Sequence, residues 1–281
     1  MHSMRRVADK AGVAPATMLR LARRLGLDDY ETLRGICRDL VRRNTDGSPF
    51  TQRARALQSR RDEQDGHGLL ADLLRAELDN LDRTLSSAES GQRLTAATEM
   101  LLAARRVFVV GRRSCYPVAS FFFYTYRLFR SNAVLIEDCA GSFGHDLIEI
   151  GAPDVLLAVS FEPYSAETIA AAEMARVAGA RIVAVTDTTL SPLARTASVT
   201  LIAANASPAF LQSIVAATAL TQALVIDLFL RSGPASVEAL ATNEARLREQ
   251  GAYWTGENAR QRPRARAGAL ALRPHTPNAT T

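Results

Sequence analysis

The stretch RRVFVVGRRS, residues Arg105 to Ser114, decides the fold of this chain of 281 residues. Its centre is the apolar run from Val107 to Val110, which is too short for a helix and rich in β-branched and aromatic types. Such a run predicts a strand that is buried on both faces. Gly111 ends the strand, and Pro117 stands where a helix can begin. A strand, a polar glycine turn and a helix start together point backbone N–H groups at an anion.

The turn itself carries side chains that suit an anionic ligand. Arg112 and Arg113 offer positive charge, and Ser114 offers a hydroxyl. Together with Gly111, these residues are candidates to bind a phosphate or a carboxylate. The alternative is an ordinary strand-to-helix turn whose arginines are only solvated.

Strands and helices alternate along the part of the chain that follows this stretch. Strands are predicted at Ala133–Ile136, Asp154–Ser160, Arg181–Thr186 and Val199–Ala203, and helices at Pro117–Arg130, Asp146–Ile150, Ser165–Ala178, Ser191–Arg195 and Pro208–Arg231. This alternation predicts a three-layer α/β domain with a five-stranded parallel sheet. The last helix is apolar on nearly every side, so we expect it to be buried or to lie in a subunit contact.

Three loops follow strands of this sheet and are expected to face one site, because ligands bind at the carboxyl ends of parallel strands. They are residues 111–114, 137–144 and 160–165. The third loop ends a strand with Ser160 and leads to Ser165 and Thr168 at a helix start, where hydroxyl groups suit a phosphate. Ser165 can equally serve as a plain N-cap, and the two roles are compatible.

The chain is expected to divide into four parts. Residues 1–43 form a helical head and residues 44–68 a linker with some helix, since it opens with the breaker cluster NTDGSP. Residues 69–256 form the α/β body, which begins with amphipathic helices at Leu69–Leu85 and Arg93–Ala104. Residues 257–281 are rich in Pro, Arg and Thr and are expected to be a disordered tail.

The net charge of +5 hides an uneven distribution. Residues 1–61 contain fourteen Arg and Lys against six Asp and Glu, whereas residues 62–260 contain sixteen against twenty-three. A basic head on an acidic body indicates that only the head meets a polyanion.

Two short helices are predicted in the head, at Val7–Ala11 and Pro15–Leu25, with a turn at Gly12. Met18, Leu21 and Leu25 are expected to pack inward. The opposite face carries the candidate DNA-binding residues Thr17, Arg20, Arg23 and Arg24. The pattern predicts a helix-turn-helix whose second helix enters the major groove. The alternative is a surface helix with a solvated basic face.

The stretch VADKAGVAPATMLRLARRLGLDDYETLR, Val7 to Arg34, resembles the helix-turn-helix of RpiR-type transcriptional regulators. Ala14 stands where that family often has a serine N-cap. The family usually has two more helices before this point, so we expect a truncated or incomplete DNA-binding unit.

The body resembles the sugar isomerase (SIS) domain over about Leu94 to Arg231, through VFVVGRRSCYPVA, IGAPDVLLAVSF, YSAETIAAAEMARVAGARIVAVTD and SPLARTASVTL. The resemblance implies a phosphosugar ligand, its phosphate lying between Ser114 and the Ser160–Ser165 loop, with Thr168 contributing less. Many SIS domains read Ser-x-Ser-Gly here, whereas this chain has Glu162 and Pro163. A carboxylate repels a phosphate unless an arginine offsets it. The ligand is thus a sugar phosphate, an amino sugar or an unphosphorylated compound.

The order of head, linker and body is that of RpiR-type regulators, and it favours a DNA-binding transcription factor that senses a small metabolite. The other interpretation is a phosphosugar isomerase with a basic appendage, whose candidate acid and base groups are Glu137, Glu162 and His145. The regulator is expected to lack catalysis, cofactor and metal, and to form a homodimer or tetramer. Three scattered cysteines and no apolar span indicate a cytoplasmic protein without a membrane contact.

Overall fold

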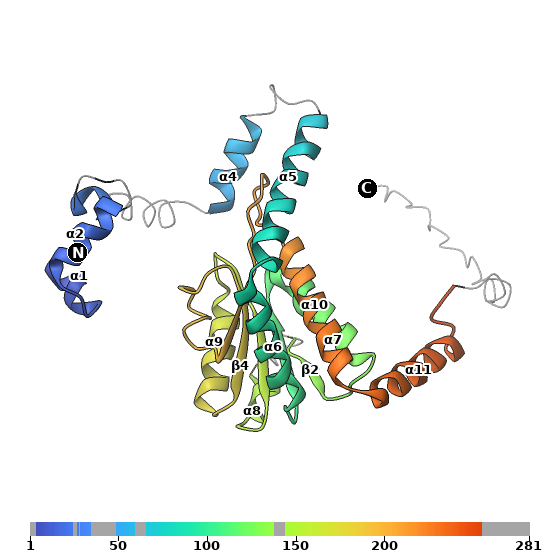
Figure 1. Ribbon diagram of the computed structural model, residues 1–281. Helices are drawn as coiled ribbons and strands as arrows, with labels where there is room; N and C mark the ends of the chain where they lie inside the picture. The colour runs from blue at the N-terminus through green and yellow to red at the C-terminus, as the bar shows by residue number, and fades with distance from the viewer. Residues whose placement is uncertain are drawn as a thin grey trace, which may run out of the picture.

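The computed structural model describes residues 4–24, 27, 29–34, 49–59, 66–137 and 144–254. Its centre is the predicted five-stranded parallel sheet, with strand order β2-β1-β3-β4-β5 (Figure 1). The strands are β1 (Val107–Gly111), β2 (Ala133–Leu135), β3 (Val155–Val159), β4 (Arg181–Thr186) and β5 (Val199–Ile202). All residues of β1 and β3 are buried, as the unbroken apolar runs predict.

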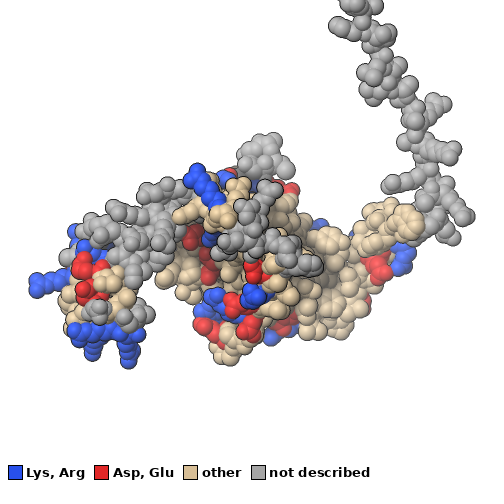
Figure 2. Space-filling view, turned by 90° about the horizontal axis from the view of Figure 1, so that it is seen from above, with Lys and Arg blue, Asp and Glu red and all other residues tan. Residues whose placement is uncertain are grey.

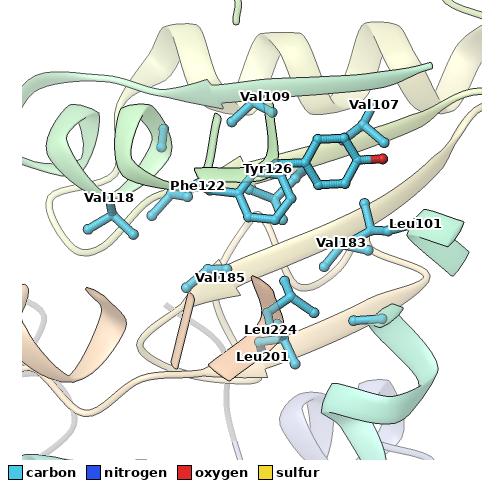
Figure 3. Packing of buried hydrophobic residues seen from close by; sticks show 14 of the residues in the cluster. Leu101, Val107, Val109, Val118, Phe122, Tyr126, Val183, Val185, Leu201 and Leu224 are labelled. Atoms are coloured by element: carbon cyan, nitrogen blue, oxygen red, sulfur yellow. The ribbon is translucent and has the colours of Figure 1, made fainter. Parts of the chain in front are cut away.

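Helices cover both faces of the sheet, which confirms the three-layer architecture. One face packs against α6 (Ala88–Leu102), α7 (Tyr116–Arg127) and α10 (Val215–Arg231), and the other against α8 (His145–Ile148) and α9 (Ala166–Val177). Alternate residues of each strand serve the two cores, so Val107 and Val109 join the first and Phe108 the second. Figure 3 shows Phe122 and Tyr126 lying against the first face of the sheet.

The two arginines that precede β1 make contacts at the amino-terminal ends of the strands, opposite the edge of the sheet that carries the predicted site. Asp154, which is fully buried, accepts two hydrogen bonds from Arg105, at 2.9 and 2.7 Å, and one from the Gly151 N–H at 3.0 Å. Arg106 lies 3.6 Å from the same carboxylate. Arg105 and Arg106, which begin the stretch that decides the fold, therefore stabilise the fold through Asp154.

Two predicted helices differ from the structure. Helix α10 begins at Val215 rather than at Pro208, and the segment before it is a loop. In this loop the Ser207 hydroxyl accepts from the Ala209 N–H and the Ser213 hydroxyl from the Val215 N–H, and such local bonds compete with helix formation. The predicted helix Ser191–Arg195 is a run of turns, in which Ser191 Oγ accepts from the Ala194 N–H.

Helix α5 (Gly66–Leu85) is joined to the loop that follows β5. The buried Asn80 side chain donates to Ala206 O at 2.7 Å and accepts from the Ala206 N–H at 3.0 Å. Thr84 Oγ1 accepts from the Ala204 N–H at 3.0 Å. The early turns of α5 rise beyond the sheet, beside α4 (Pro49–Gln58), the helix expected in the linker (Figure 1).

Helix α11 (Pro234–Glu249) was not predicted as a separate element. It follows Gly233, whose φ of +71° lies in the region that favours glycine. Asn243 donates to Leu128 O at 2.8 Å and to Arg127 O at 3.1 Å, so α11 satisfies carbonyl groups at the end of α7.

The head consists of α1 (Met4–Lys10) and α2 (Pro15–Arg24), with Gly12 in the turn at a φ of +64°. Ala8 and Ala22 are fully buried between the helices. The prediction that Leu21 packs inward is wrong, since this side chain is 45% exposed. The closely packed alanines take the inner positions instead, and Leu25 lies outside the described residues.

Within the described ranges, no single helix is long and apolar enough to span a membrane, and α10 with α11 meets those criteria only as a pair bent by 114°. Cys115 is a buried free thiol, whereas Cys37 and Cys139 lie outside the described residues, as does the predicted tail at 257–281.

Candidate functional site

The candidate site lies at the carboxyl edge of the sheet, where the strand order changes direction. Neighbouring strands β1 and β3 send their following helices to opposite faces, α7 to one and α9 to the other. We call the region between these two strand ends the crevice, because ligands of open parallel sheets usually bind there.

The turn after β1 depends on the absence of a side chain at Gly111. A Cβ atom added there would lie 2.8 Å from the Cys115 carbonyl oxygen and 2.8 Å from Ala119 Cβ. The close approach lets the chain pass through a short 3₁₀ turn, Arg113–Cys115, directly into α7. Arg113 has a φ of +54°, which is strained for a residue with a side chain. Arg113 and Ser114 are exposed at this edge.

The loop after β3 is built on two serine hydroxyls. Buried Ser160 accepts a hydrogen bond from the Ser165 N–H at 3.2 Å. Ser165 caps α9 by accepting from the Thr168 N–H at 3.4 Å, so the predicted N-cap role of Ser165 is present in the structure. Thr168 is fully buried, and its Oγ1 has no hydrogen-bond partner among the described residues. Both serines retain an O–H group that can donate to a ligand oxygen.

Contacts join the two loops. Arg112 Nε lies 3.8 Å from Glu167 Oε2 in the first turn of α9, and the Arg112 side chain is only 13% exposed. The Cys115 thiol interacts with the Ser114 side chain and the Phe161 backbone, while burial raises its pKa and keeps it protonated. The structure therefore brings the first and third loops into contact, through Arg112 with Glu167 and Cys115 with Phe161.

Sequence reasoning missed Asp187, which follows β4 and organises the third loop. Its carboxylate accepts from the Tyr164 hydroxyl at 2.9 Å, the Thr186 hydroxyl at 3.1 Å and the Glu162 N–H at 3.3 Å. Burial and this carboxylate raise the pKa of Tyr164, so the phenol stays a donor. An acidic residue directly after a buried strand was the available signal.

The second predicted loop is described only at its ends. Glu137 accepts a hydrogen bond from the Tyr116 hydroxyl at 2.5 Å, which ties the end of β2 to the start of α7. His145 begins α8 and is exposed, and residues 138–143 between them lie outside the described part. Within the described ranges, no cluster of three or more His, Cys, Asp or Glu could hold a metal ion.

Glu162, the unusual residue of the third loop, is exposed and connects the site to the loop before α10. The Gln212 side-chain amide donates to the Glu162 carbonyl oxygen. The next residue along that loop, Ser213, donates to Glu77 of α5 at 2.8 Å. A continuous set of bonds thus runs from the edge of the candidate site to α5.

In the head, the predicted DNA-facing residues lie on one exposed helix. Arg20, Arg23 and Arg24 are exposed on α2, and Arg20 donates to the Thr17 hydroxyl at 3.2 Å. Figure 2 shows Lys and Arg side chains along the outer edge of the head, at the left, while both signs mix on the body.

The fold belongs to the class of open α/β domains with a parallel sheet, and comparison with known proteins specifies which one. A family model described as the SIS domain matches residues 100–227. The body therefore has the SIS-domain fold, as its resemblance predicted. The matched range contains all five strands and both loops of the crevice.

Solved structures agree with this assignment. The sugar isomerase domain of the RpiR transcription factor from Sphaerobacter thermophilus is 24% identical with a TM-score of 0.59, over 63% of this chain and 98% of that chain. The NanR protein of Vibrio vulnificus, complexed with ManNAc-6P, is 21% identical with a TM-score of 0.57, over 89% and 86%. A candidate sugar-phosphate isomerase from Listeria monocytogenes is 16% identical with a TM-score of 0.51, over 60% and 93%. A comparison with curated proteins found no match.

Proposed function

We propose that the protein is a DNA-binding transcriptional regulator whose SIS domain senses a small metabolite, a phosphosugar or a related sugar. The observation that carries the proposal is the joining of a basic helical head to an acidic body with a strand-end crevice. A polyanion-binding head serves a regulator and has no use in an isomerase. The likeness to NanR, which extends over most of both chains, supports this reading.

In the proposed DNA complex, α2 enters the major groove. Thr17 lies in its first turn and Arg20 about one turn later, and both read base edges, while Arg23 and Arg24 hold phosphates. The Arg20–Thr17 bond steadies the two base-reading side chains in the free protein.

The DNA test compares two matched arginine pairs. Replacing Arg23 and Arg24 with Ala is expected to weaken binding to all sequences and to reduce the salt slope by about two. Replacing Arg246 and Arg248 on α11 removes the same charge elsewhere and is expected to leave the slope unchanged. Equal salt slopes for both double variants, measured by fluorescence anisotropy, would refute the head as the DNA-binding unit.

The proposed sugar pocket combines the turn Gly111 to Ser114 with the loop from Ser160 to Thr168. Arg112 and Arg113 supply counter-charge, and Ser114, Ser160 and Ser165 supply hydroxyl donors, with Thr168 as a weaker contributor. Glu162 distinguishes this pocket by placing a carboxylate at its rim.

A thermal-shift screen of sugar phosphates, amino sugars and organic acids identifies the ligand, because binding stabilises the native state. For a phosphorylated ligand, the Ser114→Ala/Ser165→Ala variant is expected to bind about two to four orders of magnitude more weakly by calorimetry. The control replaces Ser59 and Ser131, which are exposed outside the crevice. An unchanged dissociation constant in the first variant would place the ligand elsewhere.

The isomerase alternative makes an opposite prediction for the bound sugar. Isomerisation needs a positioned acid and base, and of the candidates Glu137 is already engaged with Tyr116. We expect no exchange of solvent deuterium into the bound sugar by NMR. Exchange at a carbon next to the carbonyl group would favour the isomerase.

Ligand control requires that the crevice communicate with the head. The bonds from Glu162 to Gln212, and from Ser213 to Glu77, connect the crevice rim to α5. A ligand that binds one conformation of this loop more tightly than another shifts the loop toward that conformation. Because the loop is bonded to α5, this helix and the segment that leads to the head move with it.

A further inference from the structure

The outer side of α5 carries a row of leucines that nothing in the described structure covers. Leu70, Leu74, Leu78 and Leu85 are 65%, 60%, 58% and 43% exposed. Spacings of four and seven residues place Leu74, Leu78 and Leu85 along one side of the helix, with the half-buried Leu81 between Leu78 and Leu85. We call Leu74, Leu78, Leu81 and Leu85 the leucine stripe.

The stripe is separate from the side of α5 that contacts the body. Glu77, Asn80 and Thr84 bond to the loop before α10, and α5 also packs against α10 itself. At 100° per residue, their mean direction differs from that of the stripe by about a right angle. A second helix can therefore lie along the stripe without displacing α5 from the body.

The stripe has the spacing of a two-helix seam. Leu78 and Leu85 take one core position of a seven-residue repeat, and Leu74 and Leu81 take the other. In an antiparallel pair of two copies, Leu78 meets Leu81 of the second copy and Leu74 meets its Leu85. All four layers are then leucine on leucine, and the contact is the same for both chains.

The flanking charges distinguish between the two directions of pairing. Arg75 and Asp82 lie beside the stripe, on the side away from the body. Arg75 donates to Asp72 of its own helix at 3.0 Å, and its side chain stays 76% exposed. Antiparallel pairing sets each Arg75 opposite an Asp82 of the second copy. Parallel pairing would instead set Glu77 near an Asp82, and like charges repel.

We propose that two copies of the chain associate by antiparallel pairing of their α5 helices along the leucine stripe. This inference extends the proposed function by naming the surface that joins two regulators, and its test requires neither DNA nor ligand. A failure of DNA binding alone therefore leaves it intact.

The first experiment measures the oligomeric state of the full chain by sedimentation velocity across a concentration series. The wild type is expected to dimerise, and Leu78→Lys to raise the dissociation constant about a hundredfold or more. The control Leu190→Lys changes an 85% exposed leucine in the turn that follows β4 and is expected to dimerise normally. A monomeric wild type, or a Leu78→Lys variant that dimerises like the control, would overturn the proposal.

A charge exchange tests the direction of pairing. Arg75→Glu alone and Asp82→Arg alone are each expected to weaken the dimer about five- to tenfold. The double variant restores the opposite charges and is expected to recover most of the wild-type affinity. Circular dichroism checks that α5 stays helical in each variant. A double variant that is no tighter than the weaker single one contradicts the antiparallel register.

Discussion

Replacing Gly111 with Ala tests whether the turn after β1 is fixed by close backbone contact. The new Cβ would lie 2.8 Å from the Cys115 carbonyl oxygen and from Ala119 Cβ. A Cβ atom essentially never lies this close to another heavy atom in a folded protein, and the Cys115 oxygen is a backbone atom that cannot rotate away. Relief requires β1 and the start of α7 to separate, and such overpacking costs about 1–3 kcal/mol. For a domain of this size, this predicts a melting temperature lowered by about 2–12 °C.

The matched control is Gly91→Ala in α6, where an added Cβ meets nothing within 4 Å. Alanine favours a helix interior over glycine, so this variant is expected to gain about 0.5–1 kcal/mol. Calorimetry or urea unfolding measures both variants against the wild type. If Gly111→Ala unfolds at the wild-type temperature while the control is stabilised, the turn is looser than its contacts indicate and does not constrain the crevice.

Three further predictions concern the edges of the sheet. Burial raises the pKa of Asp154, but the hydrogen bonds and charge of Arg105 lower it more, so the net pKa is below the usual value. The stability that the Asp154 carboxylate gives the fold is therefore present above about pH 4 and is lost as the pH falls through the folded pKa. Asp154→Asn is therefore expected to lose about 1–2 kcal/mol at pH 7 and less at pH 3 by urea unfolding. Asn80→Ala removes two bonds to Ala206 and is expected to cost about 1–3 kcal/mol, with exposed Asp79→Ala nearly neutral in the same assay. Glu162→Ser is expected to tighten a sugar phosphate about three- to tenfold by calorimetry, and weakening would show that Glu162 contacts the ligand as an acceptor.

The sheet could be predicted because fully buried parallel strands leave unbroken apolar runs, such as Val107–Val110. The start of α10 could not, because the residues before Val215 are apolar enough for a helix while serine hydroxyls bond their neighbours' N–H groups. Helix α11 escaped prediction because only Ser236 is buried along it, so it has little apolar periodicity.

The candidate site was predictable to the extent that it consists of strand ends. Ser160 follows β3 directly, and Ser114 and Ser165 lie in the loops after β1 and β3, which parallel topology places at the same edge of the sheet. The role of Asp187 was hidden because it depends on contacts with Tyr164 that no local pattern records. Likewise, the exposed side of α5 follows from the position of its neighbours and not from its own amphipathic pattern.

The paired hydrogen bonds between Asn80 and Ala206 lie between the bonds of Glu77 and Thr84 to the body, so any tilt of α5 would turn about this point. Fourteen residues separate Asn80 from Gly66 at the start of α5, a helical length of about 21 Å. A tilt of about 10° at this point would therefore displace the beginning of the helix by about 4 Å, or roughly three-quarters of one helical turn. In the proposed function, a small movement at this point would therefore become a larger one at the start of α5, the end of the helix that leads to the head.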